Sequence, residues 1–183
     1  MIVVAGPPGS GKSTLFPVSG FGVDCFNADD RAAELSGGSY LFIGGGIRQQ
    51  VNREFEAFVA DHIRDRRSFA FETTLRSEIT FEQAGMAKAA GFEVEMRYVA
   101  PRDFSLNLER VKIRADNGGH SAPETVLRQI HESSLRHLGR AIRELDVVRV
   151  YDNSEWGAAP LLVLESKQGK VSYRRAILPA WLS

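Results

Sequence analysis

Short apolar runs alternate along the chain with longer segments in which apolar residues recur at helical spacing. The apolar runs predict buried strands at residues 2–5, 23–27, 68–72, 92–99 and 147–151. The segments with helical spacing predict helices at residues 29–36, 46–66, 78–90, 103–117 and 122–145. Two further runs, 161–164 and 171–174, flank Gly169 and predict a terminal hairpin.

This alternation predicts an α/β fold of three layers, in which helices cover both faces of a mostly parallel sheet. The C-terminal hairpin is expected at one edge of that sheet. No repeat, low-complexity tract or linker divides the 183 residues, so we expect a single domain spanning 1–183. Because ligands of such folds bind at the carboxyl ends of the strands, polar residues that follow the predicted strands are the candidates for a site.

Composition and charge narrow the class of partner. Lysine plus arginine equals aspartate plus glutamate at 23 each, so the net charge is zero. That balance argues against a nucleic-acid partner, which requires a broad basic field. No stretch approaches the about 20 apolar residues of a membrane span, and the N-terminus does not resemble a signal peptide. We therefore expect a cytoplasmic protein with no membrane partner.

The first predicted strand runs directly into GPPGSGKST, residues 6–14. Residues 6–13 match the phosphate-loop pattern G-x-x-x-x-G-K-[ST], whose glycines let backbone N–H groups surround a phosphate chain. Lys12 would reach the outer phosphates, the Ser13 hydroxyl suits Mg²⁺, and a helix starting here would add its positive end. The predicted nucleotide-binding residues of this loop are Gly6, Pro7, Pro8, Gly9, Ser10, Gly11, Lys12, Ser13 and Thr14.

Three fates of the bound phosphate can be compared. Asp116-Asn-Gly-Gly119 fits the DxxG element of a GTPase, but it follows a predicted helix rather than a strand, and no NKxD element exists. A motor ATPase usually has a longer chain and an apolar strand that ends in aspartate, whereas the comparable run here ends at Glu72. A small-molecule kinase needs a base, an acceptor pocket and cations around the moving phosphoryl group.

Candidates for all three of these needs are present. Asp29 follows the second predicted strand and could take a proton from a hydroxyl group, although a helix N-cap explains the residue equally well. Glu72, Thr73 and Thr74 end the third strand at the same sheet edge, where they would meet a polar ligand or magnesium-bound water; helix capping is the alternative.

The helix at 103–117 supplies the cations. Arg110 and Arg114 lie four residues apart on it, and the glycines before His120 could let a segment at about 114–123 close as a lid. The alternative is a solvated helix face. Trp156 and Trp181 are interpreted as packing residues near the C-terminus.

Taken together, these segments resemble the zeta toxin-like branch of P-loop kinases, related in fold to shikimate, gluconate and adenylate kinases. The matching segments are GPPGSGKST (6–14), NAD (27–29), SFAFETTL (68–75), RVKIRADNGGHSAPE (110–124) and YDNS (151–154). The resemblance implies Mg²⁺-dependent transfer of the γ-phosphate of ATP to a hydroxyl of a small or nucleotide-linked substrate. The family's named toxins phosphorylate UDP-N-acetylglucosamine, which makes a UDP-sugar one candidate acceptor.

The resemblance also assigns roles to residues. Asp29 falls on the position of the catalytic base, Lys12 and Ser13 on the phosphate and magnesium positions, and Arg110 or Arg114 on the lid position that contacts the transferring phosphate. The remaining assignments are Glu72, Thr73, Thr74 and Arg48 on the substrate side, Asn153 beside the adenine, and His120 or Arg128 in place of a second lid arginine. Two alternative functions stay open: a nucleotide-binding module controlled by an antitoxin partner, and a simple ATPase.

Overall fold

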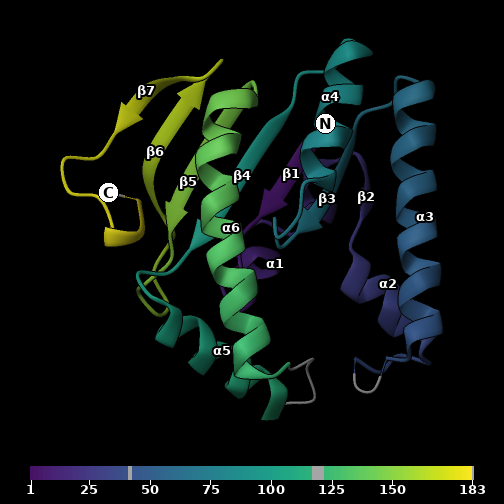
Figure 1. Cartoon of the computed structure of the whole chain (residues 1–183), viewed down its shortest axis with the longest axis horizontal. Coiled ribbons are helices and arrows are strands. Elements are labelled where there is room, and N and C mark those ends of the chain that lie inside the picture. Colours follow the sequence, from purple (N-terminus) through teal and green to yellow (C-terminus); the bar gives the residue numbers. More distant parts are fainter. Residues whose placement is uncertain (41–42, 117–121, 183) are drawn as a thin grey trace.

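The structure is a computed structural model, and it describes residues 1–40, 43–116 and 122–182. The strands are β1 (Ile2–Ala5), β2 (Asp24–Phe26), β3 (Phe69–Thr73), β4 (Glu95–Ala100), β5 (Val147–Asp152), β6 (Leu161–Lys167) and β7 (Lys170–Arg174). The α-helices are α1 (Lys12–Leu15), α2 (Ala28–Leu35), α3 (Gly45–Arg64), α4 (Ile79–Ala89), α5 (Phe104–Asp116) and α6 (Glu124–Glu144). Two short 3₁₀ helices, η1 (Val18–Phe21) and η2 (Ala180–Leu182), complete the described elements (Figure 1).

All seven strands form one sheet in the order β2-β3-β1-β4-β5-β6-β7. The strands from β2 to β5 pair in parallel, and β6 and β7 pair antiparallel as an edge hairpin. Gly169, with φ of +74°, makes the hairpin turn, a conformation that favours glycine. The predicted parallel sheet with an edge hairpin is confirmed.

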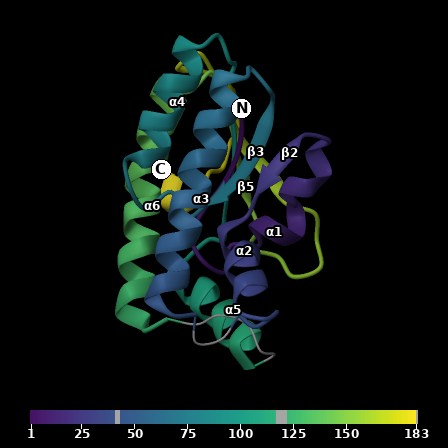
Figure 2. The same ribbon diagram turned by 90° about the vertical axis from the view of Figure 1, so that its right-hand side faces the viewer.

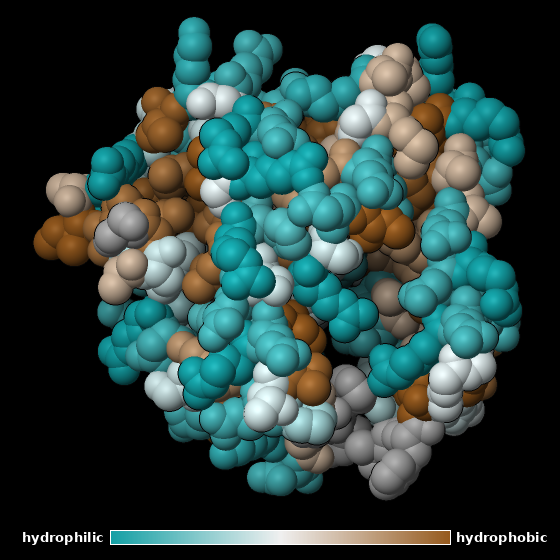
Figure 3. Space-filling model, in the orientation of Figure 1, coloured by the Kyte–Doolittle hydropathy of each residue, from teal (hydrophilic) through white to brown (hydrophobic). Residues whose placement is uncertain are grey.

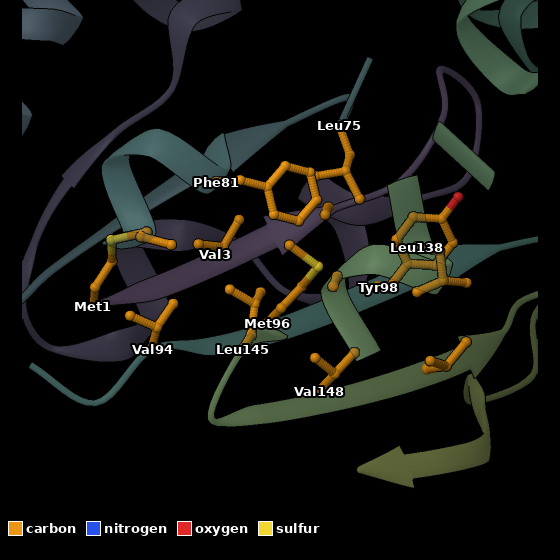
Figure 4. Close-up of a cluster of buried hydrophobic side chains, with 14 of the residues drawn as sticks. Met1, Val3, Leu75, Phe81, Val94, Met96, Tyr98, Leu138, Leu145 and Val148 are labelled. Carbon is orange, nitrogen blue, oxygen red and sulfur yellow. The ribbon is translucent and has the colours of Figure 1, made fainter. Parts of the chain in front are cut away.

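Helices α3, α4 and α6 cover one face of the sheet (Figure 2). Their apolar residues pack on alternate strand residues, so Val59, Phe81 and Leu138 contact the same core as Phe71 and Met96. Figure 4 shows this cluster, in which the strands contribute side chains from one face only. Burial of this face supplies most of the apolar core.

The opposite face is covered much more thinly than expected. Among the elements that the structure describes, only the single turn of α1 and the 3₁₀ helix η1 pack on it, around a small cluster that contains Val4, Val18 and Ala70. The helix after the phosphate loop is short because Pro17 follows it: proline removes a backbone donor and pushes Phe16 out of helical geometry, to φ −135° and ψ 66°.

Charged residues occupy part of this thin face. The Arg97 guanidinium lies 5.2 Å from the Phe16 ring centre and 4.7 Å from that of Phe21. Arg149 pairs with Glu95 and Glu165, at 2.6 and 2.8 Å. None of the helices in the described ranges has the length and apolar character needed to cross a membrane.

Candidate active site

A cavity of about 980 Å³ opens at the carboxyl edge of the parallel strands. Its walls come from the phosphate loop, from α2 and α3, from the β3–α4 connection, from α5 and α6, and from the loop after β5. Figure 3 shows a hollow between the α6 side and the α3 side of this face. The cavity lies where a parallel α/β sheet is expected to bind its ligand.

The phosphate loop forms the floor of the cavity. Pro8, Gly9 and the segment 11–14 line it, whereas Ser10 is fully buried beneath. The Lys12 side chain is only 7% exposed, and its ammonium group donates to the carbonyl of Pro7 at 3.2 Å. Burial lowers the pKa of Lys12, an effect that the nearby Glu72 carboxylate partly offsets.

Glu72 connects strand β3 to the loop. Its carboxylate accepts a hydrogen bond from the Ser13 hydroxyl at 2.8 Å and lies 3.7 Å from the Lys12 ammonium. Among the described residues no group of three or more His, Cys, Asp or Glu side chains could hold a metal alone. Two adjacent hard oxygen donors nevertheless fit Mg²⁺, which usually takes few protein ligands and completes its shell with phosphate oxygens and water.

The contacts at the start of α2 distinguish between the two roles considered for Asp29, a base and a helix N-cap. The Asn27 side chain caps this helix, accepting from the backbone N–H groups of Asp29 at 3.0 Å and Asp30 at 3.4 Å. The capping role is therefore filled by Asn27. Asp29 lines the cavity, and its carboxylate has no hydrogen bond or ion pair within the described part of the chain.

The turn after β3 presents Thr73 and Thr74 to the cavity. Leu75 follows them in the left-handed region, at φ +54°, and is completely buried. Its N–H donates to the Thr73 hydroxyl at 3.1 Å, and its carbonyl accepts from Nδ1 of His137 at 2.8 Å. Helix α4 begins at Ile79 with no side-chain cap, so these threonines are not helix caps. Strained backbone next to a cavity is typical of functional turns.

Two asparagines brace the phosphate loop from outside, and only one of them was predicted. Asn153, after β5, donates to the carbonyl of Ser10 at 2.9 Å. Asn107, on α5, is 2% exposed and donates to the carbonyl of Pro8 at 2.8 Å. Asn107 lies within the helical pattern of the sequence, where nothing distinguishes it from an ordinary polar position.

The two arginines of α5 lie in different surroundings. Arg114 lines the cavity, and its charge helps to lower the pKa of Lys12. Arg110 donates to the backbone carbonyl of Asn153 at 2.8 Å and lies 4.9 Å from the ring centre of Trp156. Its partial burial lowers its pKa.

The interpretation of the tryptophans as packing residues is wrong for Trp156. That side chain is 61% exposed and lines the cavity. Trp181 does pack: it is partly buried against the main core, and its ring centre lies 6.3 Å from that of Tyr98.

The structure does not bring all substrate-side candidates together. Arg48 lines the cavity, but Arg128 does not appear among the lining residues. The Arg128 guanidinium instead pairs with Glu124 at 3.2 Å and lies 4.3 Å from the ring centre of Phe104. His120, with the rest of residues 117–121 of the predicted lid at 114–123, lies outside the described residues.

Comparison with known proteins places the chain in a family. A family model described as zeta toxin matches residues 46–158, more than half of the chain. An uncharacterized protein of Haemophilus influenzae is 27% identical over 128 residues, which cover 69% of this chain and 89% of that protein.

Solved structures share the fold at low sequence identity. The AvrRxo1-ORF1:-ORF2 complex contains a chain that matches with a TM-score of 0.71 at 19% identity, over 96% of this chain and 60% of that one. In the same complex crystallised with ATP the TM-score is 0.68 at 18% identity, over 93% and 59% of the two chains. A chain of the PezAT chromosomal toxin-antitoxin system of Streptococcus pneumoniae matches with a TM-score of 0.61 at 14% identity, over 99% of this chain and 75% of that one. The chain thus spans about 60% of the length of the AvrRxo1 chains that it matches. Together with the family match, these structures confirm the resemblance and the fold class.

Proposed function

The chain belongs to the zeta toxin family, and we propose that it is a kinase that transfers the γ-phosphate of ATP to a hydroxyl group of a small substrate. One observation carries the proposal. The buried Lys12, the Ser13–Glu72 pair and the Asp29 carboxylate, which has no hydrogen bond or ion pair to another described residue, all line a single cavity of about 980 Å³. A phosphate loop and a candidate base in one cavity suit transfer between two bound molecules better than they suit hydrolysis alone.

The proposed roles follow from position. Lys12 and the backbone N–H groups of the loop hold the outer phosphates of ATP, and Ser13 and Glu72 hold Mg²⁺, which neutralises charge on those phosphates. The acceptor oxygen forms a bond to the γ-phosphorus while the bond from that phosphorus to the bridging oxygen of ADP breaks. Asp29 accepts the proton of the acceptor hydroxyl, and Arg114 stabilises the negative charge on the transferring group.

The acceptor is expected to lie against α2, α3 and the β3–α4 turn. Thr73, Thr74 and Arg48 offer hydrogen bonds there, and Val51 and Phe55 offer an apolar wall. A UDP-sugar is the first acceptor to test. We place the reaction in the cytoplasm, where ATP is supplied. The AvrRxo1 and PezAT structures come from a two-protein complex and a toxin-antitoxin system, which supports an antitoxin as a candidate partner of this chain.

The substitution Asp29→Asn tests the proposal. Transfer from labelled ATP is screened over UDP-sugars, nucleosides and small hydroxylated metabolites, and kcat is then measured on the acceptor found. Loss of the base is expected to lower kcat by about 10²–10⁴-fold, with unchanged affinity for ATP.

Asp30→Asn is the matched control, because Asp30 is the neighbouring carboxylate, accepts from the Tyr40 hydroxyl at 2.9 Å, and does not line the cavity. Equal transfer by Asp29→Asn and wild type would remove Asp29 as the base. Phosphate release that needs no acceptor and is insensitive to Asp29→Asn would identify a simple ATPase instead.

A further inference from the structure

Arg97 places a charged side chain in the middle of the thinly covered face of the sheet. It lies on β4 between Met96 and Tyr98, whose fully buried side chains belong to the main core on the other face. Its register partner on β1 is Val4, which belongs to the small cluster of the thin face. The Arg97 side chain is 29% exposed and pairs with Glu95 at 3.1 Å. A half-buried charge at the centre of a sheet face is unusual enough to need a local reason.

Two phenylalanine rings provide that reason. The Arg97 guanidinium lies 5.2 Å from the ring centre of Phe16 and 4.7 Å from that of Phe21. Both distances are within the range of about 6 Å for a cation–π contact. Phe16 directly follows α1, and Phe21 is the last residue of η1. One side chain therefore connects the two described elements that pack on this face (Figure 2).

Phe16 ends the helical turn on which two phosphate-site residues lie. Its backbone N–H donates to the carbonyl of Lys12 at 2.8 Å and so closes the single turn of α1. Its ring also contacts Tyr151 of β5, with the two ring centres 4.8 Å apart. A displacement of the Phe16 ring would therefore move the turn that carries Lys12 and Ser13.

This hold on α1 comes from behind the site. Neither Arg97 nor Phe16 lines the cavity, so an effect of either residue on a bound nucleotide has to pass through α1. The hydrogen bonds from Asn107 and Asn153 reach the part of the loop before Lys12. A single helical turn is marginal by itself, so contacts at its far end contribute to its position.

We propose that Arg97 is a positioning residue for phosphate binding. By its contacts with Phe16 and Phe21 it fixes α1, and with α1 the Lys12 and Ser13 side chains. The inference rests on the proposed function, which assigns those two side chains to the phosphates of ATP and to Mg²⁺. Loss of Arg97 should accordingly weaken every ligand that has phosphates on the loop, whether or not the ligand has a base.

Calorimetry with ATP and with inorganic tripolyphosphate, both in the presence of Mg²⁺, tests the assignment. Arg97→Met keeps an apolar chain without the cation, and should bind both ligands about 5-fold more weakly, the size expected for one lost cation–π contact. Arg97→Lys keeps a cation beside the rings and should retain most of the affinity. In the double variant Arg97→Met/Phe16→Leu the loss should be smaller than the product of the two single losses, because both residues act through one contact.

Arg149→Met is the matched control. Arg149 is the register partner of Arg97 on β5, and its guanidinium pairs with Glu95 at 2.6 Å and with Glu165 at 2.8 Å. The substitution removes a charge and two ion pairs from the same face without releasing Phe16. Arg149→Met should therefore bind both ligands like wild type. Urea denaturation of every variant separates a change in stability from a change in affinity.

The outcomes separate this inference from the proposed function. Unchanged affinity in Arg97→Met overturns the inference whatever happens to stability, since Arg97 would then only stabilise the fold. Equal losses in Arg97→Met and Arg149→Met overturn it as well, and so do losses that multiply in full in the double variant. If wild type binds neither ligand, the phosphate-loop function itself fails, and the role of Arg97 fails with it.

Discussion

Gly9 is the point where the phosphate loop touches the helix that carries both arginines. Its φ is +75°, and a Cβ atom there would lie 2.4 Å from the backbone carbonyl oxygen of Asn107 and 3.1 Å from a methyl group of Val111. Both contacts belong to α5. Gly9→Ala is therefore expected to push α5 away from the loop.

The cost of this substitution has two parts. A left-handed conformation with a Cβ atom costs about 1–2 kcal/mol. The clash adds about 1–3 kcal/mol, because the obstacle at 2.4 Å is backbone and cannot rotate away as a side chain would. The expected loss in free energy of unfolding is the sum of these, about 2–5 kcal/mol.

Gly22 provides a control that isolates the clash. Its φ is +68°, close to that of Gly9, but nothing lies within 4 Å of a Cβ atom added there. The free energy of unfolding of Gly22→Ala should therefore fall by only about 1–2 kcal/mol, the cost of the backbone strain. Urea denaturation gives the two stabilities, and calorimetry gives the two affinities for ATP. If Gly9→Ala is no less stable than Gly22→Ala and binds ATP like wild type, α5 is not seated on the loop as described.

Two further predictions concern buried groups. The pKa of Lys12 is lowered in the folded protein from its ordinary value of 10.5, so between the folded and unfolded pKa values the unfolded chain binds more protons. Over that range the free energy of unfolding of wild type should rise with pH relative to that of Lys12→Met. Urea denaturation at a series of alkaline pH values measures this difference. Leu75→Ala should lose about 2–5 kcal/mol of stability, because it removes a fully buried side chain. Leu75→Gly should be no less stable than Leu75→Ala, because glycine relieves the left-handed strain. A clearly lower free energy of unfolding for the glycine variant in urea denaturation would contradict this.

The spacing of apolar residues predicted the helices and strands whose formation depends on residues close together in the chain. Helix α3 occupies 45–64 against a predicted 46–66, because its apolar residues recur at helical spacing over many turns. The parallel pairing of the strands, though not their order in the sheet, followed from the alternation of strands and helices. The helix predicted after the phosphate loop is present, and Pro17 limits it to the single turn Lys12–Leu15.

Contacts between distant segments could not be predicted in this way. The brace from Asn107 to Pro8 joins positions 99 residues apart, and an asparagine in a helix has no pattern that reveals its partner. Trp156 was misinterpreted for the same reason: an aromatic residue near the C-terminus is usually packed, and only the fold places its loop at the cavity. The sequence left open whether Asp29 is a base or a helix N-cap, and the hydrogen bonds accepted by the Asn27 side chain show that Asn27 is the cap.

The single turn of α1 has a consequence for how the cavity is divided. A one-turn helix does little to fix the loop before it, so the bonds from Asn107 and Asn153 tie the loop to α5 and to the segment after β5. In the proposed reaction these parts bind ATP and are called the donor half. Helices α2 and α3, which contact each other, form the other half with the β3–α4 turn, and Glu72 reaches from there to Ser13 across the boundary. A substitution in the donor half should therefore change the affinity for ATP without changing which acceptor is used. A substitution at Arg48 or Thr74 should do the reverse, because the proposed function assigns these two cavity-lining residues to the acceptor and not to the nucleotide.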